Sequence, residues 1–225
     1  MSAKKLDILY EDNHHLVVNK PGGLLVQGDR TKRTTLLEHA KDYLRETYRK
    51  PGKVYLGLVH RIDRPSSGVV LLARTSKAAS RLSAQFRERT IRKTYWVLVE
   101  GKIDPASGRM EDHLLRRNYK SDVSTEGKKA ALAYACLPFE NASASASEPL
   151  SFVEIQLETG RHHQIRVQFS HRGHPVLGDE RYGASRAFEP ECIALHARTL
   201  VFKHIVSGEE VRVTAPAPKG FPALI

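Results

Sequence analysis

The chain has 225 residues, and its 36 Lys and Arg side chains exceed its 25 Asp and Glu by enough to give a formal net charge of +11. That length can bury a large core in one domain or two. The positive charge favours binding to a polyanion such as a nucleic acid, although a solvated basic surface has the same composition. No apolar run approaches the ~20 residues that a membrane-spanning helix needs.

The cysteines and the first residues indicate a compartment. Cys136 and Cys192 are far apart and show no metal-binding spacing, as expected of thiols in a reducing environment. Residues 1–12 carry acids early and lack an apolar core, unlike an export or transit signal. We therefore expect a cytoplasmic protein that does not associate with membranes.

The N-terminal part of the chain predicts alternating strands and helices. Strand-forming apolar residues gather in three segments, residues 8–18 (two short strands around a turn), 54–62 and 69–73. Apolar residues at helical spacing predict one helix capped by Thr34 or Thr35 and another capped by Thr75 or Ser76. A turn over residues 20–23 separates the first strands from the first helix.

The C-terminal part predicts more strands and one short helix. The strands are expected over residues 93–101, 131–137, 151–157, 194–203 and 211–214. The helix begins at about His162 and ends before Gly173 and Pro175. Residues 102–129 are polar and weakly periodic, and the low-complexity segment 141–148 is expected to be a mobile surface loop.

These elements predict an α+β fold. We expect a single domain over residues 1–225, built on one mixed, mostly antiparallel sheet with two halves, flanking helices and a central catalytic cleft.

Asp63 is the most informative residue of the chain. It lies between Arg61 and Arg64, where an apolar run ends and a turn begins. Nearby positive charge favours an ionised carboxylate even in a cleft, and a persistent anion there suits catalysis. Taken alone, however, the same residue fits an ordinary turn or helix cap equally well.

A second polar concentration lies in residues 158–175. On the predicted helix His163, Arg166 and Ser170 share one face. A helix N-terminus that carries Arg161 and Arg166 is suited to receive an anion, either a phosphate or Asp63. Considered by itself, Arg166 is more readily explained as one member of a surface salt bridge.

Neither a metal nor a nucleotide cofactor is expected. The histidines at 162, 163, 171 and 174 have no convergent cysteine or carboxylate, so they do not predict a metal site. Gly22 and Gly23 lack the spacing of a phosphate-binding loop. Tyr95, beside Trp96 in a strand, is by default a core aromatic.

Several motifs together resemble the RluA-type RNA pseudouridine synthases, and their order and separation match as well. They are the segments His60-Arg61-Ile62-Asp63-Arg64-Pro65-Ser66-Ser67-Gly68, Lys93-Thr94-Tyr95, Thr159-Gly160-Arg161-His162-His163-Gln164-Ile165-Arg166, residues 173–183 and Asn19-Lys20-Pro21-Gly22-Gly23-Leu24. The resemblance covers nearly the whole chain.

The resemblance implies an isomerase that converts uridine within RNA to pseudouridine without a cofactor or metal. The bond from ribose C1′ to base N1 breaks, the base turns, and C1′ joins C5. Asp63 is implied as the essential catalyst. It could attack C1′ or remove a proton from C2′, and the sequence does not separate these.

The same resemblance implies four substrate-binding residues. Arg166 pairs with Asp63 and keeps it ionised and oriented. Tyr95 stacks on the target base, and Ile165 forms the apolar wall of its pocket. Arg61 fills the gap that the flipped uridine leaves in its stack.

The chain departs from many members of the family in carrying Pro65-Ser66 and His162, and we expect it to lack the N-terminal S4-like RNA-binding domain that many of them have. We therefore expect it to bind ribosomal or transfer RNA through its own basic surface. We also expect a monomer. That surface includes Arg81, Arg87, Arg89, Arg92 and Lys93. The alternatives are a catalytically idle RNA-binding module of the same fold, and a glycosylase, which would leave an abasic site.

Overall fold

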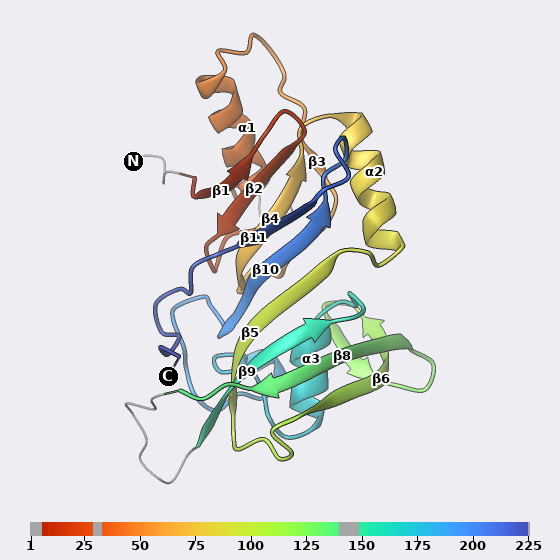
Figure 1. The fold of residues 1–225 in the computed structure, drawn as a ribbon. Helices are drawn as coiled ribbons and strands as arrows, with labels where there is room; N and C mark the ends of the chain where they lie inside the picture. The colour runs from red at the N-terminus through yellow and green to blue at the C-terminus, as the bar shows by residue number, and fades with distance from the viewer. Residues whose placement is uncertain (1–5, 29–32, 140–148, 225) are drawn as a thin grey trace. The chain divides into compact units, whose positions relative to one another are not determined.

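The computed structural model describes residues 6–28, 33–139 and 149–224. The loop predicted over residues 141–148 lies outside these ranges. The chain divides into two compact units (Figure 1). The first unit comprises Met1–Ile91 and Thr199–Pro216, and the second comprises Arg92–Arg198 and Ala217–Ile225.

The first unit is a small sheet with two helices. Its strands are β1 (Ile8–Glu11), β2 (His15–Lys20), β3 (Gly57–Leu58), β4 (Ser67–Ala73), the second half of β10 (Leu195–Lys203) and β11 (Glu210–Thr214). They follow the order β1-β2-β4-β10, with β3 paired to β4 and β11 paired to β10. The helices are α1 (Leu36–Thr47) and α2 (Ser76–Arg87).

Local capping explains where both helices begin. The Thr35 hydroxyl accepts a hydrogen bond from the amide of Glu38, whose carboxylate in turn accepts from the Thr35 amide, which forms a capping box. Thr75 caps α2 in the same way through the amide of Ala78. Helix α2 buries Ala78 and Leu82 in a core that also contains residues of β4, β10 and β11. One face of α2 is therefore fixed by apolar burial, and its basic residues face solvent.

The second unit is an antiparallel sheet with one helix. Its strands follow the order β5 (Arg92–Glu100), β9 (Leu150–Leu157), β8 (Lys128–Cys136), β6 (Ser107–Arg117) and β7 (Lys120–Val123). Helix α3 (Gln164–His171) contacts β6 and β7, and a short 3₁₀ helix (Glu180–Tyr182) follows it.

The core of the second unit lies between the sheet and α3. Val97, Val153 and Ile155 contribute from the strands, and Ile165 and Phe169 contribute from the helix. Val167 lies in a smaller cluster with Leu114 and Tyr182. Helix α3 is therefore buried on more than one face, which explains why a charged residue of this helix can be almost inaccessible to solvent.

The predicted fold is confirmed: the described residues form a mixed, mostly antiparallel sheet with three α-helices. The central cleft stays a prediction. The predicted strand over residues 54–62 is wrong except at Gly57–Leu58, because the ring of His60 takes the amide of Leu71 that a longer strand would pair. Strands β6 and β7 were not predicted. No helix of the described residues has the length and apolar character to cross a membrane.

Candidate active site

Asp63 lies in a tight turn between β3 and β4. Its carbonyl accepts a hydrogen bond from the amide of Ser66 over 3.1 Å. Asp63 is half-buried, Arg61 is exposed, and Ile62 between them is buried. The short segment thus alternates between solvent and core, and the buried Ile62 anchors it while the charged residues stay accessible to a ligand.

A buried lysine ties this turn to the preceding loop. Lys20, at the end of β2, is fully buried, and its ammonium donates hydrogen bonds to the carbonyls of Pro21 (2.9 Å), Leu24 (2.8 Å) and Arg64 (3.1 Å). The amide of Gly23 donates to the same Arg64 carbonyl over 2.9 Å. Charge-assisted bonds of this kind offset the cost of burying the ammonium. The residue next to Asp63 is therefore fixed from two directions.

Sequence reasoning missed the role of Lys20. The sequence signal is a cation two residues after the apolar strand residues Leu16, Val17 and Val18 and directly before a Pro-Gly turn. A cation in that position needs several acceptors if it is buried. Gly23, at φ 79°, adopts the left-handed conformation that lets its amide reach Arg64.

His60 holds the other side of the Asp63 turn. Its Nε2 accepts a hydrogen bond from the amide of Leu71 over 2.8 Å, which places the ring proton on Nδ1. The ring stacks on Phe86 of α2 with 4.8 Å between ring centroids. The His60 ring thereby takes the place of a backbone carbonyl as the acceptor for the amide of Leu71 in β4. The strand pairing of β3 with β4 ends at Leu58, and the chain continues toward Asp63.

Two of the predicted substrate-binding residues share one core in the second unit. Tyr95, on β5, is half-buried and packs against the hydrophobic cluster that includes Ile165 of α3. Ile165 is 4% exposed. The structure therefore brings Tyr95 and Ile165 into the same apolar cluster, as a base pocket with an aromatic face and an aliphatic wall requires. Their roles toward a base stay predictions.

Arg166 is buried and forms a bidentate ion pair with Asp179. Its Nε lies 2.6 Å from Asp179 Oδ2 and its terminal nitrogen 2.8 Å from Oδ1, and both side chains are at most 4% exposed. The guanidinium also lies over the ring of Tyr182, 5.0 Å from its centroid. This ion pair replaces the surface salt bridge considered above. The pairing of Arg166 with Asp63, which belongs to the first unit, stays a prediction.

The histidines before α3 build its N-terminus. His163, at φ 54°, precedes the helix, and its ring stacks on that of His162 with 3.7 Å between centroids. His162 Nδ1 lies 2.9 Å from the Ser121 hydroxyl, and His163 Nδ1 lies 2.8 Å from the Tyr182 hydroxyl. These ring nitrogens are used in hydrogen bonds within the protein. The predicted helix start is confirmed to within two residues.

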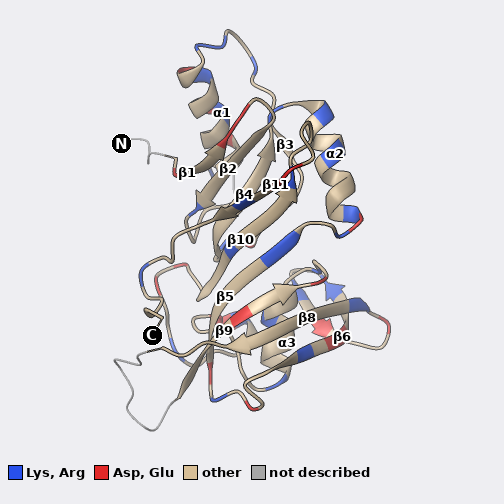
Figure 2. Ribbon diagram, in the orientation of Figure 1, with Lys and Arg blue, Asp and Glu red and all other residues tan. Residues whose placement is uncertain are grey.

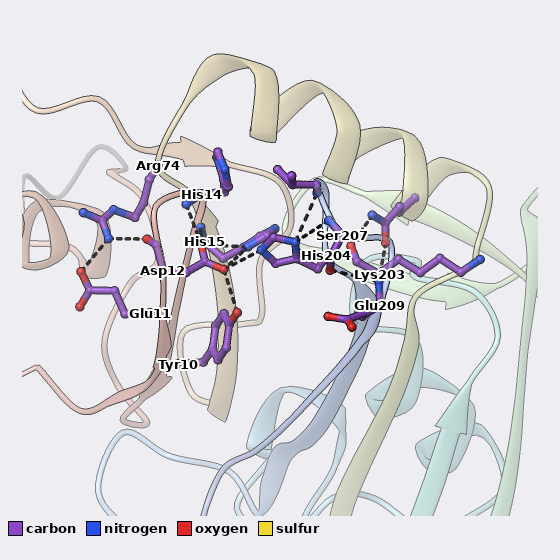
Figure 3. A network of polar contacts seen from close by, with 12 residues as sticks. Tyr10, Glu11, Asp12, His14, His15, Arg74, Lys203, His204, Ser207 and Glu209 are labelled. Carbon is purple, nitrogen blue, oxygen red and sulfur yellow. Dashed lines mark hydrogen bonds and ion pairs between the residues drawn. The ribbon is translucent and has the colours of Figure 1, made fainter.

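A different group of residues comes nearest to a metal site among the described parts of the chain. Asp12, His15 and His204 place their ligand atoms within 4.8 Å of one another (Figure 3). His15 Nδ1 and His204 Nε2 lie 2.9 and 3.0 Å from the Asp12 carboxylate, and the Tyr10 hydroxyl donates to it over 2.8 Å. The cluster joins the β1–β2 turn to the β10–β11 turn.

The positions of the ring protons in this cluster argue against a bound metal ion. The amides of Val206 and Ser207 donate to His204 Nδ1, so Nε2 carries the ring proton and cannot ligate in that form. Burial lowers the pKa of His15 and outweighs the opposing effect of Asp12. Burial alone would raise the pKa of Asp12, but its hydrogen bonds from His15, the His14 amide and Tyr10 lower it below the ordinary range. The cluster is thus a neutral-histidine and carboxylate network.

Basic side chains are exposed on both units. Lys and Arg mark α2 and the first residues of β5 (Figure 2). Arg81, Arg87 and Arg89 of the first unit and Arg92 of the second are exposed, and Lys93 is half-buried. Arg81 also donates a hydrogen bond to the carbonyl of Ile205 over 2.6 Å, which orders its side chain.

The fold and these motifs define a family of RNA-modifying isomerases. Residues 14–171 match the family model described as RNA pseudouridylate synthase. The chain therefore belongs to this family, and more narrowly to its RluA-type members, as the motifs predicted.

Similar proteins carry related names. An uncharacterized RNA pseudouridine synthase of Bacillus subtilis, YhcT, is 35% identical over 95% of this chain and 69% of its own length. The ribosomal large subunit pseudouridine synthase C of Vibrio parahaemolyticus is 34% identical over 93% of this chain and 65% of its own length. The chain thus spans about two thirds of the length of these relatives.

Solved structures share the fold. The structure of human RNA pseudouridylate synthase domain containing 1 superposes with a TM-score of 0.76 at 28% identity, over 96% of this chain and 85% of that one. Human RNA pseudouridylate synthase domain containing 4 has a TM-score of 0.79 at 24% identity, over 95% and 89% of the two chains, which bears on the fold alone.

Proposed function

We propose that this chain converts specific uridines of RNA to pseudouridine, with Asp63 as the essential catalyst. The observation that carries the proposal is the construction of the Asp63 turn inside the family motif. A fully buried ammonium from Lys20 and a ring nitrogen from His60 fix the backbone on either side of Asp63. A fixed backbone holds the Asp63 carboxylate in a defined position, which a nucleophile or base requires in order to react with one particular ribose atom.

Arg166 is the proposed partner of the Asp63 carboxylate. A guanidinium has five N–H donors, and two of them serve Asp179. The same group can therefore bridge two carboxylates, with Asp179 setting its plane and Asp63 receiving its charge. An arginine preset in this way stabilises the ionised form of the catalyst without a large loss of side-chain entropy.

The remaining roles concern the base. Tyr95 is proposed to stack on the target uracil and to help the proton step at C5, and Ile165 to close the apolar side of the pocket. Arg61, exposed two residues before Asp63, is proposed to occupy the stack that the flipped nucleotide vacates. Residues 1–225 are proposed to act as one catalytic domain and as a monomer.

Ribosomal RNA is the proposed substrate class, ahead of transfer RNA. Two relatives are named ribosomal large subunit pseudouridine synthases, which supports this order. The formal charge of +11 supports RNA binding in general. The proposed compartment is the cytoplasm. Because phosphate contacts release counterions, the affinity for RNA should fall steeply between low and physiological salt.

Asp63→Asn tests the catalytic assignment. We expect this nearly isosteric change to abolish pseudouridine formation while RNA affinity stays within about threefold, because the loss concerns chemistry and one hydrogen-bond acceptor. Asp42→Asn, at an exposed acid of α1, is the matched control and should keep full activity.

The readout is carbodiimide mapping of pseudouridines in RNA from cells with and without the protein, with RNA mass measured in parallel. Isomerisation leaves the mass unchanged, whereas a glycosylase would release the base. Full activity of Asp63→Asn would refute the mechanism. Binding without any conversion of uridine by the unmodified protein would instead indicate an idle RNA-binding module.

A further inference from the structure

The β6–β7 hairpin of the second unit ends in a tight exposed turn. Arg117 and Lys120 form the last pair of the two strands, so only Asn118 and Tyr119 connect them. Asn118 adopts φ 52°, a left-handed conformation that asparagine tolerates better than most residues. The chain here makes a two-residue connection of defined geometry.

Tyr119 stands at the tip with its side chain in solvent. It is 70% exposed, the highest value for a large hydrophobic side chain in the described part of the chain. Its backbone is nevertheless held, because Arg181 donates a hydrogen bond to its carbonyl over 3.0 Å and Arg116 donates to the carbonyl of Asn118 over 3.2 Å. An ordered backbone therefore presents an aromatic ring that buries little of its surface.

The hairpin is fixed to the residues before α3 at a point directly beside its turn, because Ser121 pairs with Arg116, one position from the last pair. The amide of Ser121 donates to the Tyr182 hydroxyl over 2.9 Å, and the Ser121 hydroxyl lies 2.9 Å from His162 Nδ1. Tyr182 also lies beneath the guanidinium of Arg166. Tyr182 thus links the hairpin to the predicted substrate-binding residue Arg166 within the second unit, through a hydrogen bond on one side and a cation–π contact on the other.

Positively charged residues flank the hairpin turn, and one of them, Lys120, holds its ammonium over the ring of Tyr182 at 5.3 Å from the centroid. Arg116, Arg117, Lys120 and Arg181 are all exposed. Asp122 lies 4.0 Å from Lys120 and offsets part of this charge. An exposed aromatic face among cations is the chemistry with which proteins bind unpaired nucleotides, because the ring stacks on a base while the cations contact phosphates.

We propose that Tyr119 is a stacking platform for an unpaired nucleotide of the RNA, outside the pocket that receives the target uridine. The inference rests on the proposed function, since it takes RNA as the ligand, and it adds a contact site to it. The surrounding arginines and lysine favour RNA over an apolar protein partner, because they would have to be desolvated in a protein interface without acidic counterparts.

Tyr119→Ala and Tyr119→Phe separate stacking by the aromatic ring from any contribution of the tyrosine hydroxyl. The probe is a fluorescein-labelled RNA stem-loop with a uridine loop, titrated by fluorescence anisotropy at fixed salt. We expect Tyr119→Ala to raise Kd about 5- to 150-fold and Tyr119→Phe to stay within about threefold, because both tyrosine and phenylalanine have a π-face. Tyr55→Ala, at another exposed tyrosine, is the matched control and should leave Kd unchanged.

Heparin, a polyanion without bases, provides the second readout. Arg117→Ala should weaken binding to both the stem-loop and heparin, whereas Tyr119→Ala should weaken only the stem-loop. An unchanged stem-loop Kd for Tyr119→Ala, or an equal loss toward heparin, would overturn the proposal. Binding and conversion are measured separately, so a protein that binds the stem-loop through Tyr119 but makes no pseudouridine would refute the proposed function and leave this inference standing.

Discussion

Replacing Lys20 by methionine tests whether the buried ammonium positions the catalytic turn. Methionine fills a similar volume without a donor, so the carbonyls of Pro21, Leu24 and Arg64 all lose a partner. The Arg64 carbonyl keeps its hydrogen bond from the amide of Gly23. Each lost bond to a charged donor costs ~1.5–3 kcal/mol, and part of the total is recovered because an ammonium no longer has to be desolvated. We expect the free energy of unfolding to fall by about 3–5 kcal/mol.

The assay has a stability arm and a kinetic arm. Urea unfolding measures the loss of stability, and single-turnover pseudouridine formation is measured at a temperature where the variant is still folded. We expect turnover to fall at least about tenfold with little change in RNA affinity, because the displaced group is the backbone next to Asp63. Lys203→Met, at an exposed lysine of the same unit, is the control and should change stability by less than ~0.5 kcal/mol.

Two results would refute this reasoning. If Lys20→Met were as stable as the unchanged protein, the three hydrogen bonds would not carry the stated energy. If the variant were destabilised but turned over at full rate while folded, Lys20 would stabilise the first unit without positioning Asp63.

Two further predictions concern charged groups in the two units. Arg166→Lys keeps the charge but loses the parallel bonds to Asp179, so it should lower the unfolding free energy by about 1–2 kcal/mol and turnover more than about tenfold; full turnover would refute the proposed pairing with Asp63. Acidification should destabilise the protein, because the folded-state pKa values of His15 and Asp12 lie below their ordinary 6.5 and 3.8, and the unfolded chain therefore binds more protons. In urea titrations from about pH 8 to about pH 5, stability should fall below the ordinary histidine pKa, and His15→Leu should flatten that slope; an unchanged slope would contradict the assignment.

Local signals were sufficient for the helix starts. One of the two residues predicted for each cap forms it, Thr35 for α1 and Thr75 for α2, because capping involves residues only three positions apart. The strand predictions failed where tertiary contacts decide. His60 ends β3 through a bond to Leu71, eleven positions away, which strand propensity does not register.

The candidate site was predictable in its chemistry but not in its supports. The arginine pattern around Asp63 and the motif that contains Arg166 nominate the proposed reacting groups from sequence, and their roles stay predictions. Asp179, which orients Arg166, and Lys20, which fixes the Asp63 turn, are ordinary charged residues of their segments until folding buries them. Strands β6 and β7 were missed because many of their residues face solvent and give no long apolar run.

The buried cations of the two units, Lys20 and Arg166, are subject to the same physical requirement. An ammonium or guanidinium that is removed from water must have its donors satisfied, and that requirement leaves few allowed positions for the groups it binds. Lys20 uses this constraint to fix a backbone, and Arg166 is itself fixed by Asp179 and Tyr182. Because the Tyr182 hydroxyl also accepts a hydrogen bond from the amide of Ser121, Tyr182 is one of the groups that fix Arg166 and one of those that fix the β6–β7 hairpin. Within the second unit, the proposed catalytic partner and the proposed RNA contact therefore share a support.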